Sequence, residues 1–404
     1  MLFRIEELAR LRELVHLPPT QDITARQWAV LEPRLASTTA ALSERVKRAR
    51  DRVMPQAEEP HARRLFNELL GRVELDLARA YAFFDTYMDV LSQRRVPLLG
   101  AQLAGCDVLA CDAMMRRHPV LASIEPPLVY CDRGFGAAIM RESVRMPDGS
   151  PNPMPLIQIP YSRLKEKYNL TSILHEAGHQ SLQRLGMVKP LGEALRAAAM
   201  NESRAGTVPD LYRLWSSEIG PDFWAFCLSG VAEASAVREL FALPLPHATR
   251  ISMTDPHPPP YVRALLAFDW CRRAWGRGVW DEWELEWKDS YALERVPAET
   301  RMMLVKATRL VPAISAALFD ARFKPLRRRR LTSLFDLEAI SPSRIAPIAA
   351  SVRSGVLNLR NLTPCAQLSV FGELRARHPM NEERLDRLMT EWLIRLGATR
   401  HTLH

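Results

Sequence analysis

Residues 175 to 179 of this 404-residue chain read His-Glu-Ala-Gly-His, residue types and a spacing that can activate water on a metal ion. Histidines four residues apart lie about one turn from each other on the same face of an α-helix. The imidazoles of His175 and His179 can therefore reach one divalent cation, and Glu176 lies beside them as a base for an attacking water. The pattern predicts one Zn²⁺ per chain and hydrolysis with Glu176 as the general base.

A catalytic zinc usually has three protein ligands, so the third ligand must come from another part of the chain. Glu218 and Glu233 are the two candidates. We favour Glu218, because Asp222 follows it four residues later and would lie on the same helical face. A carboxylate in that position can accept a hydrogen bond from a ligating histidine and fix its tautomer. Pro221 predicts that this helix begins near Glu218, since proline fits the first turn of a helix.

A proline-rich segment further along the chain holds more candidates for the site. Its prolines restrict the backbone, so His257 is held in a defined place shortly before the next expected helix. We predict that His257 or Tyr261 donates a hydrogen bond to the oxyanion that forms during hydrolysis. Arg263 is expected to bind a carboxylate, which is either Asp222, Asp255 or one on the substrate. The alternative is a structural turn that only starts the helix.

These three segments, in this order, resemble the gluzincin group of metallopeptidases, which is thermolysin-like in the broad sense. In that group a glutamate is the third zinc ligand, and an aspartate four residues later supports the first histidine. The resemblance extends from about Pro155 to Arg263 and implies a zincin-like core that acts on a peptide or protein substrate. It implies zinc binding by His175, His179 and Glu218, general-base catalysis by Glu176, and support of His175 by Asp222. The connection from His179 to Glu218 is longer than in thermolysin itself, which argues against a close relationship.

The elements around the motif must position these residues. Asn169 can cap a helix that runs from about Leu170 to Leu185, and Gly186 can end it. Apolar residues recur at helical spacing in this segment, so one side of the helix can be buried. Strands are predicted before it, at residues 128–130, 137–146 and 156–159. We therefore predict a mainly α protein with a small antiparallel β-sheet, in which helical domains flank the zincin-like core.

The expected division is an N-terminal helical domain (1–120), a zincin-like domain (121–280) and a C-terminal helical region (281–404). Charges interrupt the first residues too early for the apolar core of a signal peptide. No run of about eighteen apolar residues indicates a membrane-spanning helix, so we expect no membrane insertion. The six cysteines form no Cys-x-x-Cys pair. We expect a cytoplasmic protein with reduced cysteines.

A net charge of +9 and the basic run at residues 324–330 raise the question of an anionic partner. The run can contact phosphates or an acidic protein patch, although a solvated charge run is the simpler interpretation. No nucleic-acid-binding motif accompanies it, so nucleic acid stays an unsupported alternative. Two other functions also stay open. One is an interaction or regulatory protein with a structural zinc that His257 closes as a fourth ligand, and the other is hydrolysis of a non-peptide amide. Glu176 argues against the first, because a structural site needs no general base.

Overall fold

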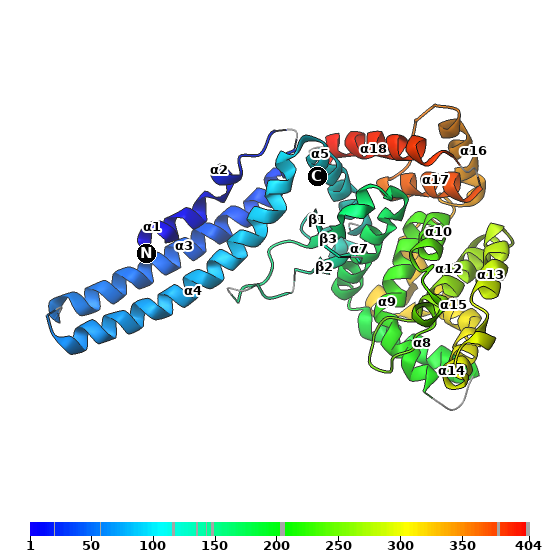
Figure 1. The fold of residues 1–404 in the computed structure, drawn as a ribbon, viewed down its shortest axis with the longest axis horizontal. Coiled ribbons are helices and arrows are strands. Elements are labelled where there is room, and N and C mark those ends of the chain that lie inside the picture. Colours follow the sequence, from blue (N-terminus) through cyan, green and yellow to red (C-terminus); the bar gives the residue numbers. More distant parts are fainter. Residues whose placement is uncertain are drawn as a thin grey trace.

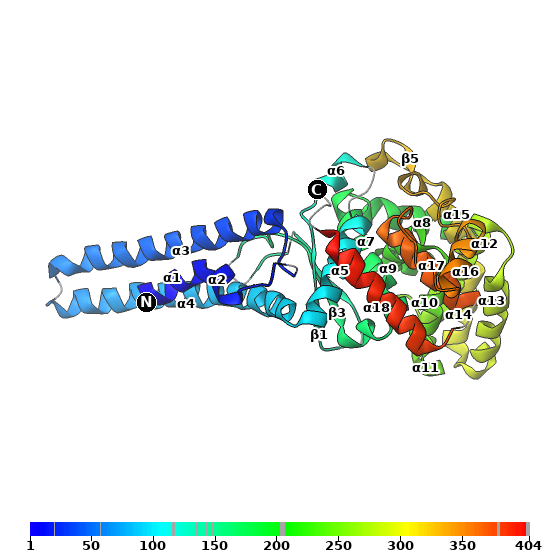
Figure 2. The same ribbon diagram turned by 90° about the horizontal axis from the view of Figure 1, so that it is seen from above.

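The computed structural model describes residues 1–19, 21–56, 58–114, 118–134, 136–142, 144–146, 149–202, 207–377 and 380–400. Helices dominate these residues and form a long arm that projects from a globular part (Figures 1 and 2). One small three-stranded sheet lies where the two parts meet. The prediction of a mainly helical protein with a small sheet is therefore confirmed.

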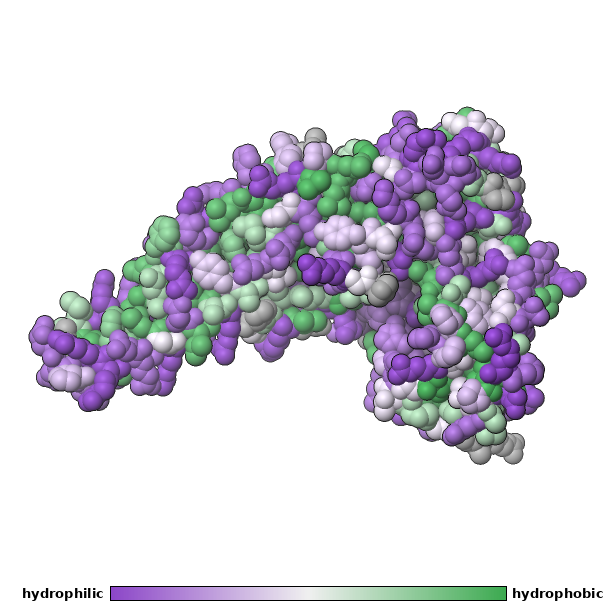
Figure 3. Space-filling view, viewed as in Figure 1, coloured by the Kyte–Doolittle hydropathy of each residue, from purple (hydrophilic) through white to green (hydrophobic). Residues whose placement is uncertain are grey.

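The arm is built from α1 (Leu2–Glu7), α2 (Leu11–Val15), α3 (Ala25–Val53) and α4 (Pro60–Ser92). The side chains of Thr24 and Gln27 cap the start of α3 reciprocally, and Pro60 occupies the first turn of α4. With 29 and 33 residues, α3 and α4 are about 44 and 50 Å long at 1.5 Å per residue. The arm has a hydrophobic core of its own. Hydrophobic patches also lie among the hydrophilic side chains on its surface (Figure 3).

The remaining helices form the globular part, which includes the helix with the histidine pair. Their bounds are α5 (Pro97–Met114), α6 (Pro119–Ala122), α7 (Thr171–Arg184), α8 (Val188–Glu202), α9 (Val208–Ser229), α10 (Val231–Leu240), α11 (Leu245–Ala248), α12 (Pro260–Trp275), α13 (Val279–Ser290), α14 (Ala298–Arg309), α15 (Val311–Asp320), α16 (Pro342–Arg353), α17 (Pro364–Arg377) and α18 (Glu382–Ala398). The metal-motif helix α7 packs on α5 and α9, and the last helix, α18, packs on α5. The last helix of the chain thus supports α7 through α5.

The sheet contains β1 (Leu128–Asp132), β2 (Ala138–Met140) and β3 (Leu156–Pro160), in the order β1-β3-β2. Strand β2 pairs antiparallel with β3, but β1 pairs parallel with it, so the prediction of an antiparallel sheet is wrong for one of the two pairings. The reason is the order of the strands. The chain passes from β1 to β2 and then enters β3 between them, so β3 runs opposite to β2 and in the same direction as β1. The strand expected at residues 137–146 is also shorter, since it ends at Met140.

The sheet separates two hydrophobic cores. Successive side chains of a strand point to opposite faces. Accordingly, Leu128 and Leu156 belong to the core of the arm, whereas their neighbours Val129 and Ile157 belong to the core around α7. All four side chains are fully buried. The strands therefore join the arm and the globular part through one shared layer.

A buried ion pair closes the outer edge of β1. The Arg94 guanidinium donates to both carboxylate oxygens of Asp107, at 2.6 and 2.9 Å, and to the Val129 carbonyl at 2.6 Å. Asp107 in turn accepts from the Val129 amide at 2.8 Å, and the Gln93 side chain bonds both backbone groups of Cys131. Side chains thus satisfy the backbone of β1 where a further strand would otherwise pair.

One helical stretch of the described chain, Ala298–Asp320, is long and apolar enough to cross a membrane by length and composition. A bent pair, Pro60–Arg95 with Pro97–Met114, passes the same test only if it is counted as one span. The core helix of a folded domain passes this test as well, and Leu304, Ile314 and Leu318 in the first stretch are fully buried.

The closest helix contact of the motif is made by Gly178 on α7. A Cβ atom at this position would lie 2.9 Å from the Pro221 Cα and 3.0 Å from the Trp224 Cβ, both on α9. Such distances are shorter than ordinary carbon contacts, so only glycine lets the two helices approach this closely. The glycine inside the His-Glu-Ala-Gly-His motif therefore sets the distance between the helices that carry the candidate ligands.

Gly178→Ala should destabilise the protein by about 1–3 kcal/mol, because α7 and α9 must separate to admit the methyl group. Gly71→Ala is the matched control. Gly71 lies in α4, and an added Cβ would meet no atom within 4 Å. This control should leave stability unchanged or raise it by up to about 1 kcal/mol, since alanine favours the helix. Urea unfolding of both variants measures the difference, and equal stabilities would contradict the tight contact.

Candidate metal centre

The histidine pair lies on α7, as the sequence predicts. The helix begins one residue after the predicted start and ends at Arg184, followed by Gly186 with a φ of +65°. Asn169 is not its cap, because a 3-10 turn (Lys167–Leu170) runs directly into the helix. The rings of His175 and His179 have centroids 4.9 Å apart, and their Nε2 atoms are 3.2 Å apart.

Glu218 on α9 completes a group of three donor side chains. Its carboxylate oxygens lie 3.3 Å from the His175 Nε2 and 3.6 Å from the His179 Nε2. A tetrahedral zinc with bonds of about 2.1 Å keeps its ligand atoms about 3.4 Å apart. The separations of 3.2, 3.3 and 3.6 Å lie near that value, the last two to different oxygens of Glu218, so the residue types and their proximity fit a zinc ion. All three donor atoms lie within 4.8 Å of one another.

Glu233, the other candidate for the third ligand, lies on α10 and is not part of this group. It is 3% exposed, and burial together with the nearby Asp222 raises the pKa of its carboxyl to about 7. The geometry therefore favours Glu218. The helix that carries Glu218 differs from expectation, however, because α9 begins at Val208 and Pro221 lies in its interior. Nearly all of the helix around Pro221 is buried, so tertiary packing outweighs the lost backbone hydrogen bond.

Asp222 joins the centre to α12. Its carboxylate lies 2.7 Å from the His175 Nδ1 and accepts a hydrogen bond from it; in a neutral ring this bond selects the tautomer whose Nε2 has a lone pair for a metal. The same carboxylate accepts two bonds from Arg263, at 2.7 and 2.6 Å. Among the three partners expected for Arg263, the structure therefore selects Asp222. Arg263 also stacks on the Phe241 ring, 4.4 Å from its centroid.

The charges of the centre favour a cation. Burial lowers the pKa of His175, but Asp222 and Glu218 outweigh it and raise the pKa to about 10. Burial raises the pKa of Glu218, yet its hydrogen bonds with His175 and His179 bring it well below its usual range. Burial likewise raises the pKa of Asp222, and the charges of Arg263 and His175 lower it again. Both carboxylates are thus ionised at neutral pH and can balance the charge of a divalent ion.

Glu176 lies beside the donor group but does not belong to it. It is 7% exposed, and burial raises the pKa of its carboxyl. One helical turn later, Gln180 is bound to Glu142, which closely follows β2. The Gln180 side chain donates to the Glu142 carboxylate at 3.1 Å and accepts from the Glu142 amide at 3.4 Å. The helical face of Glu176 and Gln180 is therefore tied to the chain that leaves β2.

His257 lies at the edge of the centre. Its Nδ1 bonds the Asp255 carboxylate at 2.7 Å, and its Nε2 lies 3.7 Å from a Glu218 oxygen. The side chain is 59% exposed. His257 does not belong to the group of three donors, and its role as a fourth ligand stays an alternative.

Tyr261 is not brought to the centre. It lies in the first turn of α12, is 4% exposed, and packs edge-on against Tyr291 with ring centroids 6.4 Å apart. Burial and the charges of Glu284 and Glu294 raise the pKa of its hydroxyl to about 12. The described contacts of Tyr261 thus lie toward α13, and we assign it a packing role.

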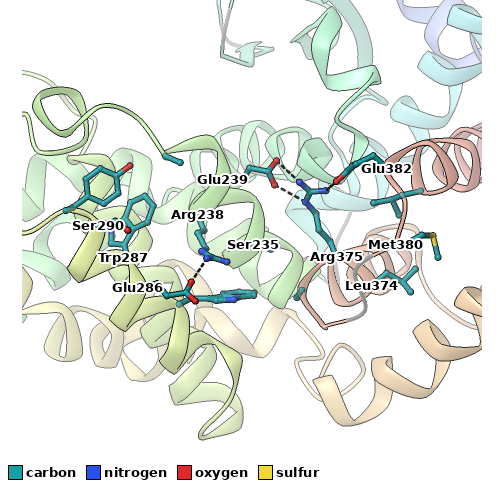
Figure 4. Close-up of a pocket in the computed structure, with 15 residues that line it drawn as sticks. Ser235, Arg238, Glu239, Glu286, Trp287, Ser290, Leu374, Arg375, Met380 and Glu382 are labelled. Carbon is teal, nitrogen blue, oxygen red and sulfur yellow. Dashed lines mark hydrogen bonds and ion pairs between the residues drawn. The ribbon is translucent and has the colours of Figure 1, made fainter.

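A separate cavity of about 680 Å³ lies between α10, α13, α17 and the start of α18 (Figure 4). Arg375 bonds both Glu239 and Glu382 there, and Arg238 pairs with Glu286. None of the residues predicted for the site lines it. Its two arginines are both paired with the three glutamates of its wall, so neither cation is left for a ligand in these pairs.

The site contains contacts that sequence reasoning missed. The Glu142–Gln180 pair joins residues far apart in the chain, and no local pattern marks Glu142. The hydrogen bond between Glu233 and Thr171, at the start of α7, is equally non-local. The spacing of Gln180 from Glu176 is a usable signal, since it places both on one face of α7.

Glu218→Ala should lower zinc affinity far more than Glu233→Ala, because only Glu218 belongs to the donor group. Asp222→Asn should lower it by about ten- to a hundredfold, since it supports a ligand without being one. Competition of each purified variant against a chelator gives the affinities, with Glu193→Ala on the exposed face of α8 as a control. Equal losses in the Glu218 and Glu233 variants would contradict the assignment.

Comparison with known proteins gives no family for this centre. No family model matches the sequence, and neither a curated protein nor a solved structure is detectably similar to the chain.

Proposed function

We propose that this protein is a zinc-dependent peptidase with a zincin-like core, in which Glu176 is the general base. The observation that carries the proposal is the arrangement around His175, His179 and Glu218. Their donor atoms lie close to one another, at separations of 3.2 to 3.6 Å, which supports a shared zinc ion. A further acidic side chain, Glu176, is buried next to them and takes no part in the donor group.

Each residue then has a chemical role. Zinc held by His175, His179 and Glu218 would supply Lewis-acid polarisation of a carbonyl group and of a water molecule. Glu176 takes a proton from the attacking water and passes it to the leaving amine. Because burial raises its pKa, its basicity is closer to that of an effective base at neutral pH. Asp222 and Arg263 keep the His175 ring in one orientation and one tautomer.

A peptide substrate is supported by the position of β2. In the strand order β1-β3-β2, this strand is paired with β3 alone among the described strands. The chain after it is tied by Glu142 to Gln180, on the same face of α7 as Glu176. An extended peptide that pairs with such an edge would run past the general base. A small non-peptide amide would make no use of this edge.

His257 is the proposed donor to the reacting carbonyl oxygen. Its Nδ1 is engaged with Asp255, so its Nε2 donates a hydrogen bond only when the ring carries a positive charge. The backbone amide of His257 also donates to Asp255, at 3.0 Å, which holds the loop and the ring together. A charged donor at the rim of the site stabilises a developing oxyanion.

Glu176→Gln should keep one zinc per chain and lower peptide hydrolysis by at least about a hundredfold, since general-base catalysis contributes that much. Zinc content and cleavage of a mixed peptide library are measured on the same preparation. Glu193→Gln, an exposed change on α8, controls for the chemistry of the substitution. Full turnover by the Glu176 variant would leave the proposed reaction without its base.

His257→Gln should retain zinc and lower turnover by roughly a hundredfold, with a smaller change in KM, because oxyanion donors act on the transition state. The control is His247→Gln, which alters an exposed histidine on α11. Loss of zinc from the His257 variant would instead indicate a closed, structural metal site.

A further inference from the structure

The basic run at residues 324–330, which takes no part in the metal centre, lies in a β-hairpin. Strands β4 (Arg322–Phe323) and β5 (Arg329–Arg330) pair antiparallel around a 3-10 turn (Lys324–Leu326). Figure 2 shows β5 at the outer edge of the globular part. The apolar side chains Phe323, Leu326 and Leu331 are buried in the main core. The core therefore holds the backbone of this segment in place, while its charged side chains stay solvated, as the simpler interpretation expects.

The hairpin presents its cations to solvent. Exposed side chains are Arg322, Lys324, Arg327, Arg328, Arg329 and Arg330. Among the ion pairs of the described chain, one carboxylate reaches this group, since Asp320 lies 3.8 Å from Arg330. Asp320 also pairs with Arg273 on α12, so its charge is shared. The hairpin thus carries a concentrated positive charge that the protein itself does not neutralise.

Two of these arginines adopt a backbone conformation that favours glycine. Arg327 has a φ of +53° and Arg328 a φ of +60°. Residues with a Cβ are strained in this region, whereas glycine adopts it freely. The turn alone would be better served by glycine at both positions. Arginine at two strained positions in succession indicates that the side chains, and not the turn, are what this segment requires.

We propose that this hairpin binds the phosphate backbone of a nucleic acid. Electrostatic contact alone is sufficient for such binding, because cations that neutralise phosphates release condensed counterions. A stable protein interface would instead need a buried apolar centre, and membrane insertion would need exposed apolar or aromatic side chains; purely electrostatic attraction to anionic lipid is the competing outcome of the test below. The apolar residues of the hairpin point into the core and supply neither. No exposed aromatic ring is present among residues 322–330 for base stacking, so binding is independent of sequence.

Binding of a fluorescent DNA duplex to the full chain, measured by anisotropy across salt concentrations, tests the proposal. If five cations each neutralise one phosphate, log K should fall against log salt with a slope of roughly −4 to −5. Arg327→Gly with Arg328→Gly should weaken binding about tenfold at low salt and make the slope shallower by about 2. The same variant should unfold at an equal or higher temperature, because glycine relieves the strained backbone.

Two further variants separate charge from structure. Arg327→Lys with Arg328→Lys should bind as the parent does, since phosphate neutralisation needs only the charge. Arg48→Gln with Arg72→Gln removes two exposed charges from the arm and should change affinity by less than about twofold. Parental affinity in the double-glycine variant would overturn the proposal. So would binding to anionic phospholipid vesicles or polyglutamate without binding to the duplex.

Discussion

The buried carboxylate of Asp222 is the interaction on which the centre depends. It lies on α9, accepts from His175 on α7, and accepts twice from Arg263 on α12. A buried carboxylate is costly unless it is fully paired, and here the two partners come from different helices. The three helices therefore cannot shift independently without leaving a charge unpaired. This constraint fixes the orientation of one imidazole, and that imidazole faces the donor atoms of His179 and Glu218.

Backbone packing complements this network. Gly178 admits Pro221 and Trp224 into direct contact with α7, so the donors on the two helices face each other at short range. The same contact explains why α9 continues through Pro221. Nearly all of that part of the helix is buried, and the gain from packing exceeds the cost of one missing hydrogen bond. Glycine and proline each destabilise an isolated helix, but here Gly178 of α7 and Pro221 of α9 contact each other in one helix interface.

The sequence was most informative where chemistry follows a helical period. The four-residue spacings of His175 with His179 and of Glu218 with Asp222 predict shared faces, and the structure places all four side chains together. The sequence was least informative about contacts between residues that are far apart in the chain. The parallel register of β1 and the bond between Gln180 and Glu142 arise from how distant segments meet, which no local pattern encodes. Tyr261 is a related case, since it is near His257 in sequence but its ring packs against Tyr291.

The arm has a mechanical consequence. Its helix α4 ends at Ser92, and the 3-10 turn that follows carries Arg94, whose guanidinium is bound to Asp107 and to the backbone of β1. If the arm turns about this ion pair as one body, a rotation of about 5° at its base moves its tip, about 45 Å away, by about 4 Å. A force at the tip acts on the base in the same way. A modest force on the far end of the arm produces a large torque on the three-stranded sheet. The other face of that sheet belongs to the hydrophobic core around α7, which carries the histidine pair.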